Sequence, residues 1–152
     1  MVTALNVGNN ILQRGFAEKI DITPMKLQKL IYFVYREYLK KTGRSLFNER
    51  FETWRYGPVI PSVYDKFKKN GSNAIRNYAF EKGENFYLTV NEESSPAFKE
   101  IIDLVWNMYK NFDGIVLSSI THAEGSAWRK AYENRRLYLL DEDISKEELV
   151  VG

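Results

Sequence analysis

Residues 23–43, with the sequence TPMKLQKLIYFVYREYLKKTG, carry the strongest helix signal in the chain. Thr23 can accept a free backbone N–H at a helix start, and Pro24 suits the first helical position. Apolar residues then recur at three- and four-residue spacing, and Gly43 favours a stop. Because further apolar residues extend this surface almost all round the cylinder, the pattern predicts a buried helix over residues 24–42 at the centre of the fold.

Shorter helices are expected on both sides of this central helix. Spacing and start signals predict them at about residues 3–16, 61–70, 95–112, 115–121 and 128–132, and a capping pattern predicts a last turn at 145–148. Apolar and polar residues alternate across about 77–90, which predicts an antiparallel β-hairpin. The expected fold is a predominantly helical α+β domain, with about five to seven helices around the central one and one small hairpin.

Composition excludes several classes of chemistry. The 152 residues fit one domain, and 44% of them are apolar, which is enough for a core. The chain has no cysteine and a single histidine, His122, so disulfide frameworks, thiol nucleophiles and sites with two imidazoles are excluded. No serine lies in a Gly-x-Ser-x-Gly turn, and no glycine-rich phosphate loop is found. The sequence therefore predicts a protein that is not an enzyme, with no catalytic, cofactor-binding or metal-binding residues.

The start of the chain lacks the basic-then-apolar layout of a signal peptide. No apolar run approaches the roughly 20 residues of a membrane span. We therefore expect a cytoplasmic protein without a membrane partner.

Positive charge is concentrated in one third of the chain. The net charge is only +2, whereas residues 26–76 contain 12 Lys and Arg against 4 acidic residues. If these cations gathered on one face, they would attract an acidic protein or a phosphate backbone. The alternative is that they form the solvated faces of amphipathic helices. The cations considered are Lys26, Lys29, Arg36, Arg44, Arg50, Arg55, Lys66, Lys68, Lys69 and Arg76.

Aromatic and basic residues interleave around a sharp turn that follows an extended segment at 51–55. Large, rigid aromatic groups beside cationic donors are typical of protein interfaces, and aromatic rings also stack on nucleic-acid bases. The other interpretation is that Trp54 and Tyr64 fill the core around the turn. The candidate partner-binding residues are Trp54, Arg55, Tyr56, Gly57, Pro58, Tyr64 and Lys66.

Three segments in this order resemble the Panacea domain, the family of SocA-like antitoxins and phage-associated GepA-like proteins. They are KLQKLIYF (26–33), WRYGPVIPSVY (54–64) and ITH (120–122), with Trp128 and Ala131 after them. The resemblance extends from about residue 3 to about 148 and indicates a single Panacea-like domain over 1–152. Family-motif residues to which we assign a structural role are Lys26, Leu27, Gln28, Lys29, Leu30, Thr121, His122 and Trp128, with His122 expected to be a buried histidine held by a hydrogen bond beside the Trp128 indole.

The resemblance implies a small bacterial or prophage protein that is encoded beside a toxin gene and neutralises that toxin by direct contact. SocA-like members are also linked to delivery of the toxin to a protease. The implied partners are thus a cognate toxin and a host protease. Two alternatives stay open: a nucleic-acid-binding regulator, suggested by the basic segment, and a phage-encoded inhibitor of a host enzyme or defence system.

Overall fold

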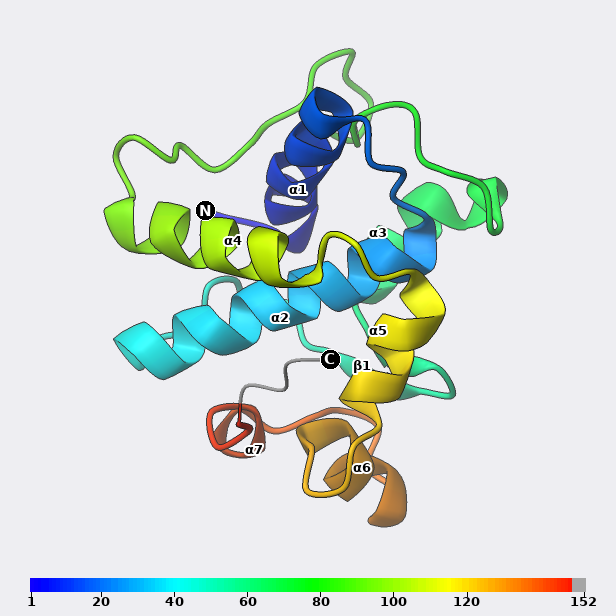
Figure 1. The fold of residues 1–152 in the computed structure, drawn as a ribbon, viewed down its shortest axis with the longest axis vertical. Helices are drawn as coiled ribbons and strands as arrows, with labels where there is room; N and C mark the ends of the chain where they lie inside the picture. The colour runs from blue at the N-terminus through cyan, green and yellow to red at the C-terminus, as the bar shows by residue number, and fades with distance from the viewer. Residues whose placement is uncertain (149–152) are drawn as a thin grey trace.

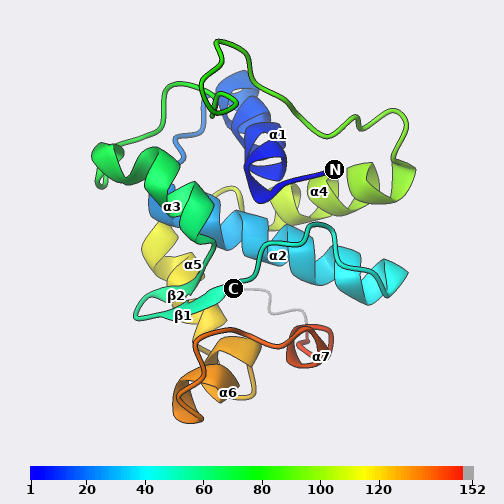
Figure 2. The same ribbon diagram turned by 180° about the vertical axis from the view of Figure 1, so that it is seen from behind.

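The computed structural model describes residues 1–148 and is built around one long buried helix, α2 (Pro24–Thr42). This helix crosses the middle of the molecule (Figures 1 and 2). Thirteen of its 19 residues are buried. It begins where the Thr23 hydroxyl accepts a hydrogen bond from the Lys26 N–H, and it ends at Gly43, which has a φ of 73°. The central helix predicted for residues 24–42 is therefore confirmed.

Six shorter α-helices surround α2 in the described part of the chain. One side of α2 is covered by α1 (Ala4–Glu18) and α4 (Pro96–Tyr109), and α6 (Ala127–Glu133) and α7 (Asp141–Ile144) lie on the opposite side (Figure 1). The other two are α5 (Gly114–Thr121), which packs closely on α2, and α3 (Pro61–Phe67), which runs into a 3₁₀ turn, η1 (Lys68–Asn70). These seven helices confirm the mostly helical α+β class.

Apolar side chains from these helices meet around α2. Leu27, Ile31 and Val34 of α2 are fully buried. On α2, the ring of Phe33 stacks on that of Tyr109 from α4, with centroids 4.4 Å apart. Because α2 is buried on several faces, its polar face is narrower than that of a helix that lies on the surface of a protein.

A two-stranded antiparallel sheet follows α2. Strand β1 (Glu52–Trp54) pairs with β2 (Gly57–Val59), with Trp54 opposite Gly57. One small antiparallel sheet is what the sequence predicts, but the predicted position, about 77–90, is wrong. In that segment the structure has one isolated bridge, between Phe80 and Tyr87.

Two buried asparagines of α1 explain this difference. Asn9 Nδ2 donates to the carbonyls of Ala79 (2.9 Å) and Leu88 (3.0 Å), and its Oδ1 accepts from the Ala79 N–H (2.8 Å). Asn10 in turn accepts from the Val90 N–H (2.7 Å) and donates to the Val90 carbonyl (3.0 Å). Backbone groups that a hairpin would pair across its two strands are thus bonded to amide side chains instead.

The last helix also differs from the prediction. Helix α7 ends at Ile144, and the turn expected at 145–148 is not helical. The reason is that Glu147 points into the protein. Its carboxylate accepts hydrogen bonds from Tyr32 and Arg36 of α2 and from the Ala127 N–H of α6. These bonds fix residue 147, in the middle of the expected turn, against α2 and α6, so the chain does not wind into a further helical turn there.

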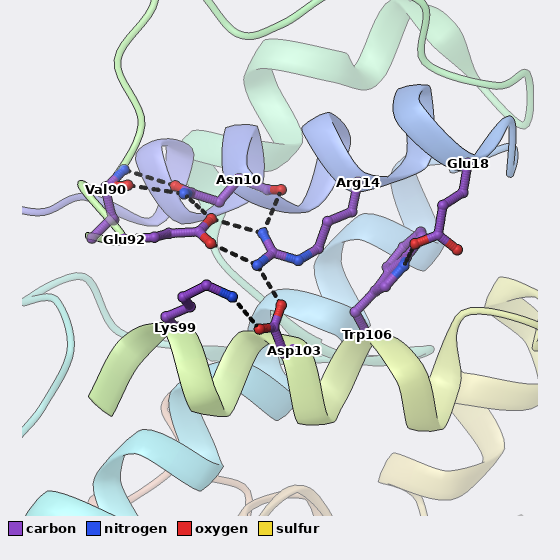
Figure 3. A network of polar contacts seen from close by, with 8 residues as sticks. All are labelled: Asn10, Arg14, Glu18, Val90, Glu92, Lys99, Asp103 and Trp106. Atoms are coloured by element: carbon purple, nitrogen blue, oxygen red, sulfur yellow. Dashed lines mark hydrogen bonds and ion pairs between the residues drawn. The ribbon is translucent and has the colours of Figure 1, made fainter. Parts of the chain in front are cut away.

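A polar network fixes the loop before α4 to α1 (Figure 3). Arg14 forms a bidentate pair with Glu92, with both N–O distances 2.7 Å, and reaches Asp103 of α4 at 2.7 Å. Asn10 donates to the same Glu92 carboxylate, and Lys99 donates to Asp103. Hydrogen bonds from Arg14 lower the pKa of Glu92. Burial of the carboxyl acts in the opposite direction, and the hydrogen bond from Asn10 lowers the pKa further.

Replacing Arg14 with glutamine is expected to lower the free energy of unfolding by about 1–2 kcal/mol at neutral pH, because a charge-assisted bidentate pair is lost. A carboxyl with a lowered folded-state pKa stabilises the fold above its ordinary value of 4.5 and loses that effect as the pH falls below it. The difference between variant and wild type, measured by denaturant unfolding, should therefore shrink between pH 7 and about pH 3.

The Arg76→Gln variant is the matched control. Its ion pair with Asp21 is exposed on both sides, so the substitution should cost less than about 0.5 kcal/mol at either pH. Equal losses in the two variants would contradict the structural role assigned to the Arg14 network.

Candidate partner-binding site

The turn between β1 and β2 is held in place by side chains from three helices. The carbonyl oxygens of residues 54, 56 and 58 each accept a hydrogen bond from a helix side chain. The donors are Trp128 Nε1 of α6 (2.7 Å), Ser118 Oγ of α5 and Lys29 Nζ of α2 (3.1 Å). This arrangement fixes the backbone while leaving the side chains at the tip free to face outward.

Gly57 is required by the close approach of this turn to the helices. Its φ is 119°, a value that side chains rarely allow. A Cβ at this position would lie 2.6 Å from Thr121 Oγ1 and 2.9 Å from Lys29 Cε. Beyond the turn, the Gln28 amide bonds both the N–H (3.0 Å) and the carbonyl (3.1 Å) of Ile60, which fixes the path into α3.

A largely apolar hollow of about 200 Å³, here called the hairpin pocket, lies between the turn, the start of α2 and α3. Its walls include Gln28, Lys29, Trp54, Tyr56, Val63 and Tyr64. The rings of Trp54 and Tyr64 are 4.8 Å apart. Tyr56 is 54% exposed and Tyr64 is 43% exposed, so two aromatic side chains are available at the rim.

The structure brings together three of the seven candidate partner-binding residues, because Trp54, Tyr56 and Tyr64 all line the hairpin pocket. Arg55 is exposed at the tip of the turn, with its guanidinium 5.4 Å from the Tyr56 ring centre. The other three take no place in the wall: Gly57 and Pro58 are buried beneath the turn, and Lys66 is exposed on α3 away from the lining.

Lys29 is the unusual member of the wall. The residue is only 1% exposed, and burial lowers its pKa to about 7. Within residues 1–148 no carboxylate forms an ion pair with its ammonium group, and the Pro58 carbonyl is its single hydrogen-bond acceptor.

His122 and Trp128 form a stack behind the turn. Their ring centroids are 3.9 Å apart, and the Trp128 ring stacks in turn on Tyr132 at 4.8 Å. The expected hydrogen bond on the histidine is not found at Nε2, which is buried and has no partner in the described chain. Burial, followed by the charges of Lys29 and Arg129, lowers the pKa of His122. Stacking rather than a hydrogen bond at Nε2 therefore orients this ring.

The remaining family-motif residues lie inside the protein. Leu27 and Leu30 belong to the core. Lys26 is buried and donates to the Lys110 carbonyl, while Thr121 donates to the Ser118 carbonyl at 2.6 Å.

The single basic face considered from the sequence is not formed as a whole. Lys26, Lys29 and Arg36, three of its ten cations, are buried. They lie on the faces of α2 that pack against other elements, which the charge count could not reveal. The positive charge of residues 26–76 is thus divided between the interior and the surface.

Five further residues line the pocket and were neither candidate binding residues nor family-motif residues: Pro24, Met25, Val59, Val63 and Gly71. Met25 and Val63 line it at the first turns of α2 and α3. Both occupy ordinary helical positions, so no local pattern distinguishes residues of the pocket wall from residues of the core.

Within residues 1–148, no three acidic or histidine side chains are grouped so that they could hold a metal ion. In the same part of the chain, no helix has the length and apolar character needed to cross a membrane.

Comparison with known proteins places these features in a family. Residues 27–129 match the family described as "Antitoxin SocA-like, Panacea domain". The chain belongs to this antitoxin family. The matched span runs from within α2 into α6 and includes the turn and all the residues that line the hairpin pocket except Pro24 and Met25. The resemblance of the three sequence segments to the Panacea domain is thereby confirmed.

One curated Panacea relative supports the same assignment. Antitoxin SocA from Caulobacter vibrioides (strain NA1000 / CB15N) is 34% identical over 129 residues, which cover 84% of this chain and 69% of that protein. No solved structure matches the chain. The family and this relative support an antitoxin role.

Proposed function

We propose that this protein is an antitoxin that binds its cognate toxin directly through the rim of the hairpin pocket. The observation that carries the proposal is the pair of exposed aromatic residues, Tyr56 and Tyr64, beside an apolar hollow on a rigidly held turn. Aromatic anchors next to pockets supply most of the binding energy in protein interfaces. A turn whose backbone is already fixed loses little entropy when a partner binds.

We further propose that the chain acts as one Panacea-like domain in the cytoplasm. Contacts between α2 and both α1 and α7 connect the two ends of the described chain through the same helix. Delivery of the bound toxin to a host protease is a second step that would follow binding. An enzymatic activity has no place in this proposal, since neutralisation needs only that the toxin be covered.

The proposal is tested by expressing the neighbouring gene in cells with and without this chain, and by copurifying the two products. Restored growth together with a stable complex is the expected result. A toxic neighbour that is neither neutralised nor bound would refute the proposal. In that case, binding to DNA that weakens steeply with salt would favour the regulator, and an unrelated host target would favour the phage-encoded inhibitor.

Alanine at both Tyr56 and Tyr64 is expected to weaken the toxin complex by about 30-fold or more, because two interface aromatic residues are removed. Charge reversal at Arg55 should weaken it as well. Stability should change little, since both rings are already substantially exposed. Isothermal titration with purified toxin measures the affinity, and thermal unfolding measures the fold.

The Leu104→Ala variant provides the control, because Leu104 is an exposed apolar residue on α4, outside the pocket wall. It should bind toxin as the wild type does. A folded double variant that retains full affinity would exclude the pocket rim as the toxin-binding surface.

A further inference from the structure

Lys29 is a buried cation without a counterion. An ammonium group has three N–H donors, and Lys29 uses one of them, toward the Pro58 carbonyl. The other fully buried cation of the described chain, Arg36, is paired with Glu37 at 2.7 Å and Glu147 at 3.1 Å. Of these two fully buried cations, the fold pairs Arg36 with carboxylates and leaves Lys29, which lines the hairpin pocket, without one. The less deeply buried Lys26 donates to the Lys110 carbonyl.

The rest of the pocket wall offers nothing that could take the place of a counterion. Trp54, Val63 and Tyr64 present mainly apolar surface, and no acidic residue lines the hollow. The amide of Gln28 is already bonded on both sides to Ile60. An uncharged apolar group could fill this hollow, but the Lys29 ammonium group would still have no counterion.

We propose that the hairpin pocket receives an acidic side chain of the toxin, whose carboxylate pairs with Lys29 Nζ while its methylene groups contact Trp54 and Tyr64. This inference rests on the proposed function and specifies the chemistry of the toxin at that same site. A carboxylate gains most beside an amine that is already out of water, because folding has met the cost of removing the side chain from solvent. Since burial lowers the pKa of Lys29 to about 7, such a carboxylate would also favour the protonated form of Lys29. Arg55 at the exposed tip adds positive charge that favours an acidic segment of the partner.

The first test needs no toxin and uses butanoate, whose four carbons correspond to Cα to Cδ of glutamate, with butyramide as the uncharged isostere. The ¹³Cε signal of Lys29, assigned by its disappearance in Lys29→Met, reports the ionisation of the ammonium group. Butanoate should raise the pH midpoint of this signal by about one unit or more, as an opposite charge within a few ångström does. It should also bind about tenfold or more tightly than butyramide.

Lys29→Met keeps an unbranched side chain that is one atom shorter and removes the charge, so it should fold and lose the preference for butanoate over butyramide. The exposed Lys66→Met on α3 is the matched control and should keep it. An unchanged Lys29 midpoint at saturating butanoate, or equal binding of the two probes, would overturn the inference. If Lys29→Met fails to fold, through-bond correlation to the Lys29 backbone assigns the signal, and the midpoint measured in the wild type still decides.

The second test uses the complex with the toxin. The Lys29 midpoint should rise on binding, and Lys29→Met should bind toxin about tenfold or more weakly than the wild type. If the wild type protects cells but Lys29→Met protects and binds equally well, the inference fails while the antitoxin function stands. If the toxin is neither bound nor neutralised but butanoate still raises the Lys29 midpoint, the proposed function fails. The inference that the pocket binds a carboxylate would then still stand.

Discussion

Replacing Glu147 with alanine is expected to lower the free energy of unfolding by about 3 kcal/mol, at the lower end of the range for breaking a buried ion pair. The Arg36 guanidinium is almost fully buried, and Glu147 lies 3.1 Å from it. The same carboxylate accepts from the Tyr32 hydroxyl and from the Ala127 N–H at 2.7 Å. Alanine would leave all three donors without this acceptor, although Glu37 would still compensate part of the Arg36 charge.

Urea unfolding of wild type, Glu147→Ala and Glu148→Ala gives the measurement and its control. Glu148 is adjacent and exposed, so its substitution should change the free energy of unfolding by less than about 0.5 kcal/mol. Because Glu147 joins α2 to α6, its loss should also increase amide exchange at the start of α6. A Glu147→Ala variant as stable as the wild type would show that the segment after α7 does not depend on this contact.

Alanine at Gly57 is expected to destabilise the fold by about 2–5 kcal/mol. One part of this cost is backbone strain, since a φ of 119° is rare for any residue with a Cβ. The larger part is the overlap of the new methyl group with Thr121 Oγ1 and Lys29 Cε, which packing on α5 and α2 prevents from moving freely. The turn would have to move away from the helices, so toxin neutralisation should fall with stability.

The Gly43→Ala variant separates the two parts of this cost. Gly43 also has a positive φ, 73°, but no atom lies within 4 Å of a Cβ placed there. It should therefore cost only about 1 kcal/mol, the penalty of the backbone conformation alone. Equal effects of the two substitutions, measured by thermal unfolding, would contradict the close contact between the turn and Thr121.

The central helix could be predicted from sequence because its signals are local. Thr23, Pro24 and Gly43 mark its ends through their own chemistry, and the structure places its bounds at Pro24 and Thr42. The hairpin expected at 77–90 was misplaced for the opposite reason. Its backbone bonds go to Asn9 and Asn10, about 70–80 residues earlier in the chain, and no local pattern reports a partner at that distance.

The candidate site was partly predictable. Aromatic and basic residue types around a turn suggested an interface, and the structure brings Trp54, Tyr56 and Tyr64 to one pocket. The interior position of Lys29 was not foreseen as a feature of that pocket, because a lysine in a helix is usually solvated. The inward turn of Glu147 was missed as well, since Ser145 and Glu148 have the spacing of a capping box and nothing in that local pattern reports the distant partner of Glu147, Arg36.

The two asparagines of α1 have a consequence for how this protein can change. Their amides hold the segment between Ala79 and Val90 through main-chain atoms only, so the bonds do not depend on which side chains the segment carries. Residues 82–89 are all exposed. Apart from Gly83, whose φ is 75°, and Tyr87, whose ring stacks on Tyr78, these positions can be substituted with the attachment intact and at little cost to the fold. The molecule thus contains a segment suited to randomised libraries, in which new binding specificities could be selected on an unchanged scaffold.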